Sequence, residues 1–197
     1  MRSKPLFRLS SLKQETINDI QSSVMEDNSS HEFLLCKGSD KIQELFPLLK
    51  HNITLHYVSN GEWSTHELIM HLLTLIGPAE LYFSTWSLKE YPVRLLLNAM
   101  ESGQITKLYA LLDGRVKVRN PEVFHLAKHS FTEVKQYDCH AKVSVLISES
   151  CTVTIVGSAN MTNNPRVEAC ILSTVPAVGQ FHKTWLLDLI KKGHPLD

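Results

Sequence analysis

The clearest hydrophobic pattern in the chain is a pair of apolar, β-rich runs. They read AKVSVLI over residues 141–147 and CTVTIVG over residues 151–157, and a short polar SES sequence separates them. Two such runs around a polar turn predict a β-hairpin. Because hairpin strands pair antiparallel, the start of the first run and the end of the second should lie side by side.

Short apolar runs and helical patterns alternate through the rest of the chain. Ser64 and Glu67 have the capping-box spacing that starts a helix, and Gly77 and Gly103 each follow a helical pattern. The predicted strands cover residues 32–37, 53–59, 79–86, 105–112 and 166–175. The predicted helices cover residues 64–76, 92–102, 121–130 and 176–192, with a weaker one after Asp40. This order predicts an α/β fold whose mixed, largely parallel sheet has helices on both faces.

The segment DGRVKVRN at residues 113–120 has a pattern of its own. Arg115, Lys117 and Arg119 alternate with valines, so an extended chain would place the three cations on one side. They would then either protect an edge strand or bind a phosphate backbone. Trp86, at the end of a predicted strand, is either a packing or lid residue or a surface on which a base stacks.

The first 31 residues are polar and weakly patterned. A narrow apolar stripe over residues 12–24 fits an N-terminal arm or surface helix, and an arm that embraces a second subunit is the alternative. We expect residues 32–197 to form one domain, since the chain has only 197 residues.

Composition narrows the choice of partner and compartment. Twenty basic and twenty acidic residues give no net charge, so a nucleic-acid partner would need a local basic patch. The four cysteines form no CxxC pair, which fits reduced thiols. The opening MRSKPLFRLS lacks the apolar core of a signal peptide, and no apolar run is long enough to span a membrane. We expect a cytoplasmic protein without a membrane partner.

The polar residues at the open end of the hairpin carry the candidate chemistry. His140 and Lys142 precede its first strand, while Ser158 and Asn160 follow its second. Each would be unremarkable alone, but the antiparallel pairing brings all four together. Lysine supplies positive charge, serine and asparagine donate hydrogen bonds, and histidine attacks phosphorus or transfers a proton. The combination predicts a site for a phosphate group.

The sequence HxK followed by GSxN resembles the phospholipase D superfamily, also called the HKD family. The stretch GSANMTNNPRVEA is similar to the family's GSAN-to-Glu segment, with Glu168 in the acidic position. The likeness is specific over residues 138–168 and looser over about 50–180. It implies a metal-independent phosphodiesterase without a cofactor, which acts through a phosphohistidine. The implied catalytic residues are His140, Lys142, Ser158, Asn160 and Glu168.

The sequence departs from the family pattern in two respects. Ile147 occupies the position of the family's aspartate, five residues after the lysine, and the stretch from Lys142 to GSxN is three residues longer than usual. They favour an alternative in which a weak or inactive module binds nucleic acid. A purely structural role, as a dimer that supports an assembly, is a third possibility.

The chain carries a single HxK/GSxN motif, whereas the family's chemistry uses two. We therefore expect a homodimer in which each subunit contributes one motif. Small single-motif members of the family resemble nucleases, and no amphipathic membrane-binding stretch is visible. The expected substrate is nucleic acid, and DNA rather than RNA.

A second histidine pattern imitates a metal site. His66-Glu67 and His71 resemble the zinc-protease motif, which needs histidines four residues apart on one helix face. Here they are five apart, about 140° round the helix. The sequence thus predicts no metal.

Overall fold

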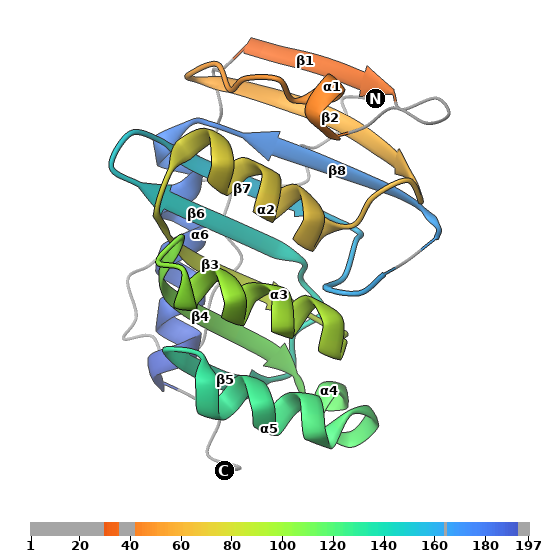
Figure 1. Cartoon of the computed structure of the whole chain (residues 1–197), viewed down its shortest axis with the longest axis vertical. Helices are drawn as coiled ribbons and strands as arrows, with labels where there is room; N and C mark the ends of the chain where they lie inside the picture. Colours follow the sequence, from red (N-terminus) through yellow and green to blue (C-terminus); the bar gives the residue numbers. More distant parts are fainter. Residues whose placement is uncertain (1–29, 36–41, 164, 193–197) are drawn as a thin grey trace, which may run out of the picture.

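The computed structural model describes residues 30–35, 42–163 and 165–192, and within them the strands form one eight-stranded sheet (Figure 1). The strands are β1 (Ser30–Leu35), β2 (Ile53–Asn60), β3 (Ala79–Thr85), β4 (Ile105–Asp113), β5 (Glu133–Tyr137), β6 (Val143–Ser148), β7 (Thr152–Gly157) and β8 (Val167–Ser173). The helices are α1 (Ile42–Leu45), α2 (Thr65–Ile76), α3 (Glu90–Glu101), α4 (Gly114–Arg119), α5 (Pro121–Ser130) and α6 (Pro176–Lys192).

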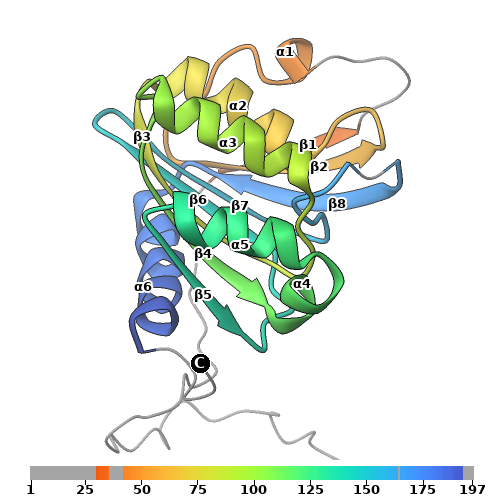
Figure 2. The same ribbon diagram turned by 60° about the horizontal axis from the view of Figure 1, so that its bottom comes forward.

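The strand order is β1-β2-β8-β7-β6-β3-β4-β5. Helices α2, α3 and α5 cover one face, and α6 covers the other (Figures 1 and 2). The expected α/β fold with a mixed sheet between helices is thus confirmed. Parallel pairing is less extensive than expected, because among the described strands three neighbouring pairs are parallel and four antiparallel. The β6–β7–β8 run turns back on itself through short loops, which do not allow parallel crossovers.

The larger hydrophobic core lies between the sheet and α2, α3 and α5. Leu68, Leu72, Leu96 and Phe83 are fully buried there. Each such side chain contributes about 1.5–3 kcal/mol relative to exposure. The predicted capping box starts α2, since Ser64 N–H donates to Glu67 Oε2 at 2.7 Å. Gly77 ends this helix with a φ of 77°, a conformation that favours glycine.

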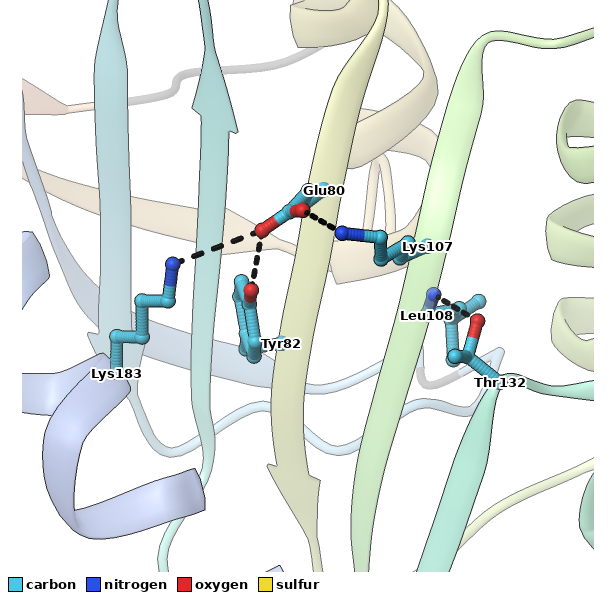
Figure 3. Close-up of polar contacts among 6 residues, drawn as sticks. All are labelled: Glu80, Tyr82, Lys107, Leu108, Thr132 and Lys183. Atoms are coloured by element: carbon cyan, nitrogen blue, oxygen red, sulfur yellow. Dashed lines mark hydrogen bonds and ion pairs between the residues drawn. The ribbon is translucent and has the colours of Figure 1, made fainter.

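Helix α6 packs on the opposite face over a second, smaller core that includes Leu111, Leu186 and Ile190. A polar network at the edge of this core joins α6 to the sheet (Figure 3). Glu80 accepts hydrogen bonds from Tyr82 and from Lys107 at 2.8 Å, and Lys183 of α6 lies 3.5 Å from its carboxylate. The hydrogen bond from Lys107, supported by that from Tyr82, lowers the pKa of Glu80.

Most predicted elements are confirmed, with boundaries that shift by one or two residues. The hairpin is β6 and β7, and the helix predicted over 176–192 is α6. One expectation was wrong, and one strand was missed. Residues 114–119 form helix α4, not an extended segment, and β5 was not foreseen. The predicted N-terminal arm lies, apart from Ser30 and His31, outside the described residues, and the domain boundary stays a prediction.

Candidate active site

The ends of five strands meet at one end of the sheet. In the register of the hairpin, Val143 at the start of β6 faces Val156 near the end of β7. Gly157 at the end of β7 in turn pairs with Cys170 of β8. The carboxyl ends of β3 and β4 lie at the same end, because β3 runs antiparallel to β6 and parallel to β4. The loops that carry the predicted site residues therefore converge there.

His140 and Lys142 lie in the extended segment that leads into β6. The His140 side chain is exposed, and Lys142 is half-buried. Lys142 Nζ donates to the backbone oxygen of His140 at 2.6 Å and lies 3.1 Å from Nδ1 of its ring. Burial lowers the pKa of the Lys142 amine, and Cys139, Glu168 and Asp113 act in the opposite direction. The structure thus pairs a cation directly with the candidate nucleophile.

Ser158 and Glu168 form a hydrogen-bonded pair beside this cation. Ser158 Oγ donates to Glu168 Oε2 and accepts from the backbone N–H of Ala169 at 3.2 Å. Gly157 allows the close approach of β8 that this pairing needs. A Cβ at that position would lie 2.2 Å from Sγ of Cys170. The glycine of GSxN therefore has a packing role, which places the following serine against β8.

Asn160 is held by its carbonyl end. Its Oδ1 accepts from the backbone N–H of Ser87 at 3.2 Å and from Thr85 Oγ1 at 3.3 Å. The buried Thr85 hydroxyl also accepts from the N–H of Met161 at 3.1 Å. With the carbonyl oxygen held in this way, the amide nitrogen is the end of Asn160 that can donate to a ligand.

Trp86 lies between the histidine segment and helix α4. Its ring meets that of His140 edge to face, with an interplanar angle of 60° and a centroid distance of 5.5 Å. Arg115 and Arg119 approach the indole at 5.1 and 4.9 Å, and Lys142 approaches it at 5.9 Å. One half-buried aromatic ring is therefore surrounded by three cations next to the candidate nucleophile.

Asp113 is a site residue that the sequence reasoning missed. The buried carboxylate accepts from the backbone N–H of Arg115 at 2.9 Å, which caps α4, and from that of Cys139 at 3.3 Å. It thereby connects α4 to the residue before His140. An aspartate followed by glycine at the end of a strand was the available signal, because aspartate is a preferred N-cap.

Solved structures agree with this architecture, although neither a family model nor a curated protein matches the sequence. A phospholipase D family member, Nuc from Salmonella typhimurium, superposes with a TM-score of 0.55 at 14% identity, over 72% of this chain and 95% of its own. NucT from Helicobacter pylori gives 0.54 at 13%, over 70% and 96%. The chain has the phospholipase D fold.

A third similar structure, polyphosphate kinase from Porphyromonas gingivalis, has a TM-score of 0.50 at 12% identity. The match covers 72% of this chain but 27% of the kinase. At these identities the likeness is one of fold. The phospholipase D fold places the hairpin centrally in the sheet, between β8 and β3.

The departure at Ile147 falls far from the site of this phospholipase D fold. Ile147 lies near the opposite end of β6 from Lys142, pairs with Glu80 of β3, and packs against the core under α6. The segment from Lys142 to GSxN, which is three residues longer than usual, consists of β6, the SES turn and β7. The substitution at Ile147 is thus remote from His140.

The basic segment is arranged differently from the expectation. Because α4 is helical, Arg115 and Arg119 share the side next to Trp86, whereas Lys117 lies elsewhere, with Nζ 5.7 Å from the Phe124 ring centroid. All three cations are exposed. The expected alignment of three cations was wrong, and two of them remain together.

The histidines of α2 point to different surroundings. His66 is fully buried, and its Nε2 lies 3.0 Å from Ser64 Oγ, while Nε2 of His71 lies 2.7 Å from the backbone oxygen of Phe46. Across the described part of the chain, no group of three or more histidine, cysteine or acidic residues is arranged to hold a metal. Within the same residues no helix is long and apolar enough to cross a membrane.

Proposed function

We propose that the protein is a metal-independent phosphodiesterase, and specifically a nuclease, which acts through a phosphohistidine at a site shared by two subunits. The observation that supports it most is the cluster of His140, Lys142, Asn160 and the Ser158–Glu168 pair at one end of the sheet. A nucleophile, a fixed cation and an oriented amide donor are the groups that phosphoryl transfer requires.

In the first step, a ring nitrogen of His140 attacks phosphorus. A nitrogen–phosphorus bond forms, and the bond from phosphorus to the leaving oxygen breaks. The second subunit supplies its own copy of the histidine, which in the protonated form gives its proton to that oxygen. The first product leaves as an alcohol, and the phosphoryl group stays on His140.

In the second step, water attacks phosphorus. The second histidine, now neutral, accepts a proton from that water, and the nitrogen–phosphorus bond breaks to release His140. Both histidines thus return to their starting states, and the cycle consumes one water. One chain carries a single motif, so the two roles require two chains.

The remaining site residues stabilise charge and fix geometry. Lys142 and the amide nitrogen of Asn160 bind the phosphate oxygens, whose negative charge is most concentrated during the displacement. Ser158 orients the site through its bond to Glu168. Glu168 in turn fixes the tautomer of a site histidine, as carboxylates do for other catalytic imidazoles.

Nucleic acid is the substrate that we favour, with DNA preferred to RNA. Nuc and NucT carry nuclease names and share the fold. Because the whole chain has no net charge, the cations around Trp86 supply the local positive field that a polyanion needs. The alternative is a module that binds nucleic acid without turnover. Ile147 in place of the family's aspartate favours that alternative.

Trapping the intermediate tests the proposal. Wild-type protein is mixed with a phosphate-labelled diester in excess chelator and quenched within the first turnover. We expect label on His140 that survives base and is lost in acid, as a phosphohistidine bond requires. His140→Ala should carry no label, and His51→Ala, which removes an exposed histidine from a turn, should label normally.

Three outcomes contradict the proposal. Turnover by His140→Ala at the wild-type rate would exclude His140 as nucleophile. Loss of wild-type turnover in chelator, with recovery on adding magnesium or zinc, would show that a Lewis acid takes part. No turnover by wild type, together with retained nucleic-acid binding, would leave the binding module as the function.

A further inference from the structure

Helix α4 presents two arginines to the site in a fixed arrangement. Arg115 and Arg119 are one helical turn apart, so their side chains emerge on the same side. Both guanidinium groups lie about 5 Å from the centroid of Trp86. Such cation–π contacts restrict two otherwise flexible side chains and orient them beside His140.

These arginines are not used in ion pairs within the described part of the chain. The salt bridges there join Arg94 to Glu90, Lys192 to Asp188, and Glu80 to two lysines. Asp113, which precedes the helix, accepts hydrogen bonds from the backbone N–H groups of Arg115 and Cys139. The positive charge of the pair is therefore available to an anion.

Helix α4 is tied to the site at both ends. Asp113 caps its first turn and binds Cys139, the residue before His140. At the other end, Asn120 Nδ2 donates to the backbone oxygen of Leu88 at 3.3 Å, just beyond Trp86. Val116 is buried beneath the helix. The arginine pair is therefore positioned relative to His140 and Lys142 by structure on both sides.

We propose that Arg115 and Arg119 form a subsite for a second phosphate, which adjoins the phosphate bound by His140 and Lys142. The inference rests on the proposed function for the position of the first phosphate. It defines the substrate class as a strand with at least two consecutive phosphodiesters. Diesters with a single phosphate, such as phospholipids and cyclic nucleotides, leave this subsite empty.

Guanidinium groups are suited to this role. Two parallel N–H groups of arginine match two oxygens of a phosphate, and the charge persists at every accessible pH. Lys142, by contrast, is a point charge whose pKa is lowered by burial. Lys142 thus binds the reacting phosphate, and the arginine pair favours strands that carry a second phosphate.

Binding of short thymidine oligonucleotides tests the subsite. TpT has one phosphate and TpTpT has two, and both are titrated into His140→Ala, which cannot turn them over. We expect TpTpT to bind about tenfold more tightly than TpT, as a charge-assisted contact implies. Arg115→Ala/Arg119→Ala should abolish this gain. Lys117→Ala is the matched control, since it removes a charge from the same helix away from Trp86.

Salt dependence gives a second measurement. For a longer single strand, losing one phosphate contact should reduce the slope of log K against log salt by about 0.7 in the double arginine variant. Arg115→Lys/Arg119→Lys should keep that slope but lose part of the second-phosphate gain, because the bidentate geometry is lost. Thermal melting of the variants establishes that each is folded.

The inference is overturned if the double arginine variant keeps the second-phosphate gain, or if Lys117→Ala loses it equally. These binding measurements do not depend on whether the protein is catalytically active. A normal phosphohistidine with no second-phosphate gain contradicts the subsite and leaves the proposed function standing. A clear gain with no phosphohistidine in wild type supports the subsite in a module that binds without turnover.

Discussion

Asp113 joins two parts of the candidate site through one side chain. Its two carboxylate oxygens accept from Arg115 and Cys139, so it both starts α4 and holds the segment before His140. Because the carboxylate is buried, removing it leaves two N–H groups without an acceptor. We regard Asp113 as a positioning residue, since it acts through its neighbours.

Replacing Asp113 should therefore affect stability and labelling together. We expect Asp113→Ala to lower the free energy of unfolding by about 1–3 kcal/mol, the cost of unsatisfied buried donors. Asp113→Asn keeps one acceptor and a good N-cap, so its loss should be smaller. The yield of phosphohistidine should fall in both variants. Urea denaturation and quenched labelling measure the two effects.

Asp138→Ala is the matched control for this prediction, because Asp138 is an exposed carboxylate directly before Cys139. It should change neither property appreciably. Equal stability of Asp113→Ala and wild type would contradict the role of Asp113, and so would unchanged labelling in a folded Asp113→Ala protein.

At the scale of elements, helix α2 starts beside the loop that carries Asn160. His66 lies in its first turn, fully buried against Tyr91 at a ring centroid distance of 5.6 Å. Burial lowers the pKa of His66, while Glu67 and a hydrogen bond with Asn163 partly oppose the shift. Asn163 belongs to the loop after β7, so the first turn of α2 lies close to the loop of the GSxN motif.

The lowered pKa of His66 makes the stability depend on pH. Below its ordinary pKa of 6.5 the unfolded chain binds a proton at His66, which the folded chain does not bind until the pH reaches the lowered value. Stability from this group is thus complete above pH 6.5 and declines below it. The slope approaches about 1.4 kcal/mol per pH unit for one proton.

Urea denaturation between pH 7.5 and 5 measures this decline. His66→Gln should be less stable at pH 7.5, because a packed ring is lost, but its stability should fall less steeply below pH 6.5. Burial also lowers the pKa of His182. Part of the dependence of stability on pH should therefore remain in both proteins. Identical slopes for wild type and His66→Gln would exclude the buried imidazole as the cause.

At the scale of the whole molecule, the site lies at an end of the sheet where one chain supplies a single His140. The proposed mechanism needs two histidines, so two such ends must face each other across a two-fold axis. The dimer is a prediction that sedimentation at micromolar concentration tests directly. A monomer at that concentration would leave the chain without its second histidine.

Subunit mixing tests whether the site is shared. A fixed amount of wild type is allowed to exchange with an equal amount of His140→Ala, which places half of the wild-type subunits in mixed dimers. If each site needs both histidines, activity should fall to about half, whereas independent sites would lose nothing. Folded His51→Ala, added in the same way, should not reduce activity. An unchanged rate after complete exchange would contradict the shared site.

The sequence by itself determined the elements that depend on local signals. The capping box of α2, the glycine after it and the polar turn of the hairpin each lie within a few residues of the structure that they specify. The convergence of His140, Lys142, Ser158 and Asn160 was predictable for the same reason, because a hairpin register follows from its own turn. Glu168 was added to the predicted site from the family pattern.

The tertiary structure alone decided the surroundings of this cluster. Residues 115 and 119 share a side in both a strand and a helix, but residue 117 joins them only in a strand, so the alternation could not fix the arrangement. Asp113 is a local N-cap signal for this helix, but the position of the helix depends on contacts distant in sequence: Asp113 with Cys139, Asn120 with Leu88, and the arginines with Trp86. β5, a polar edge strand, likewise formed because β4 offered it an open edge. Contacts of this kind cannot be read from a local sequence pattern, because the residues that make them meet only when the chain is folded.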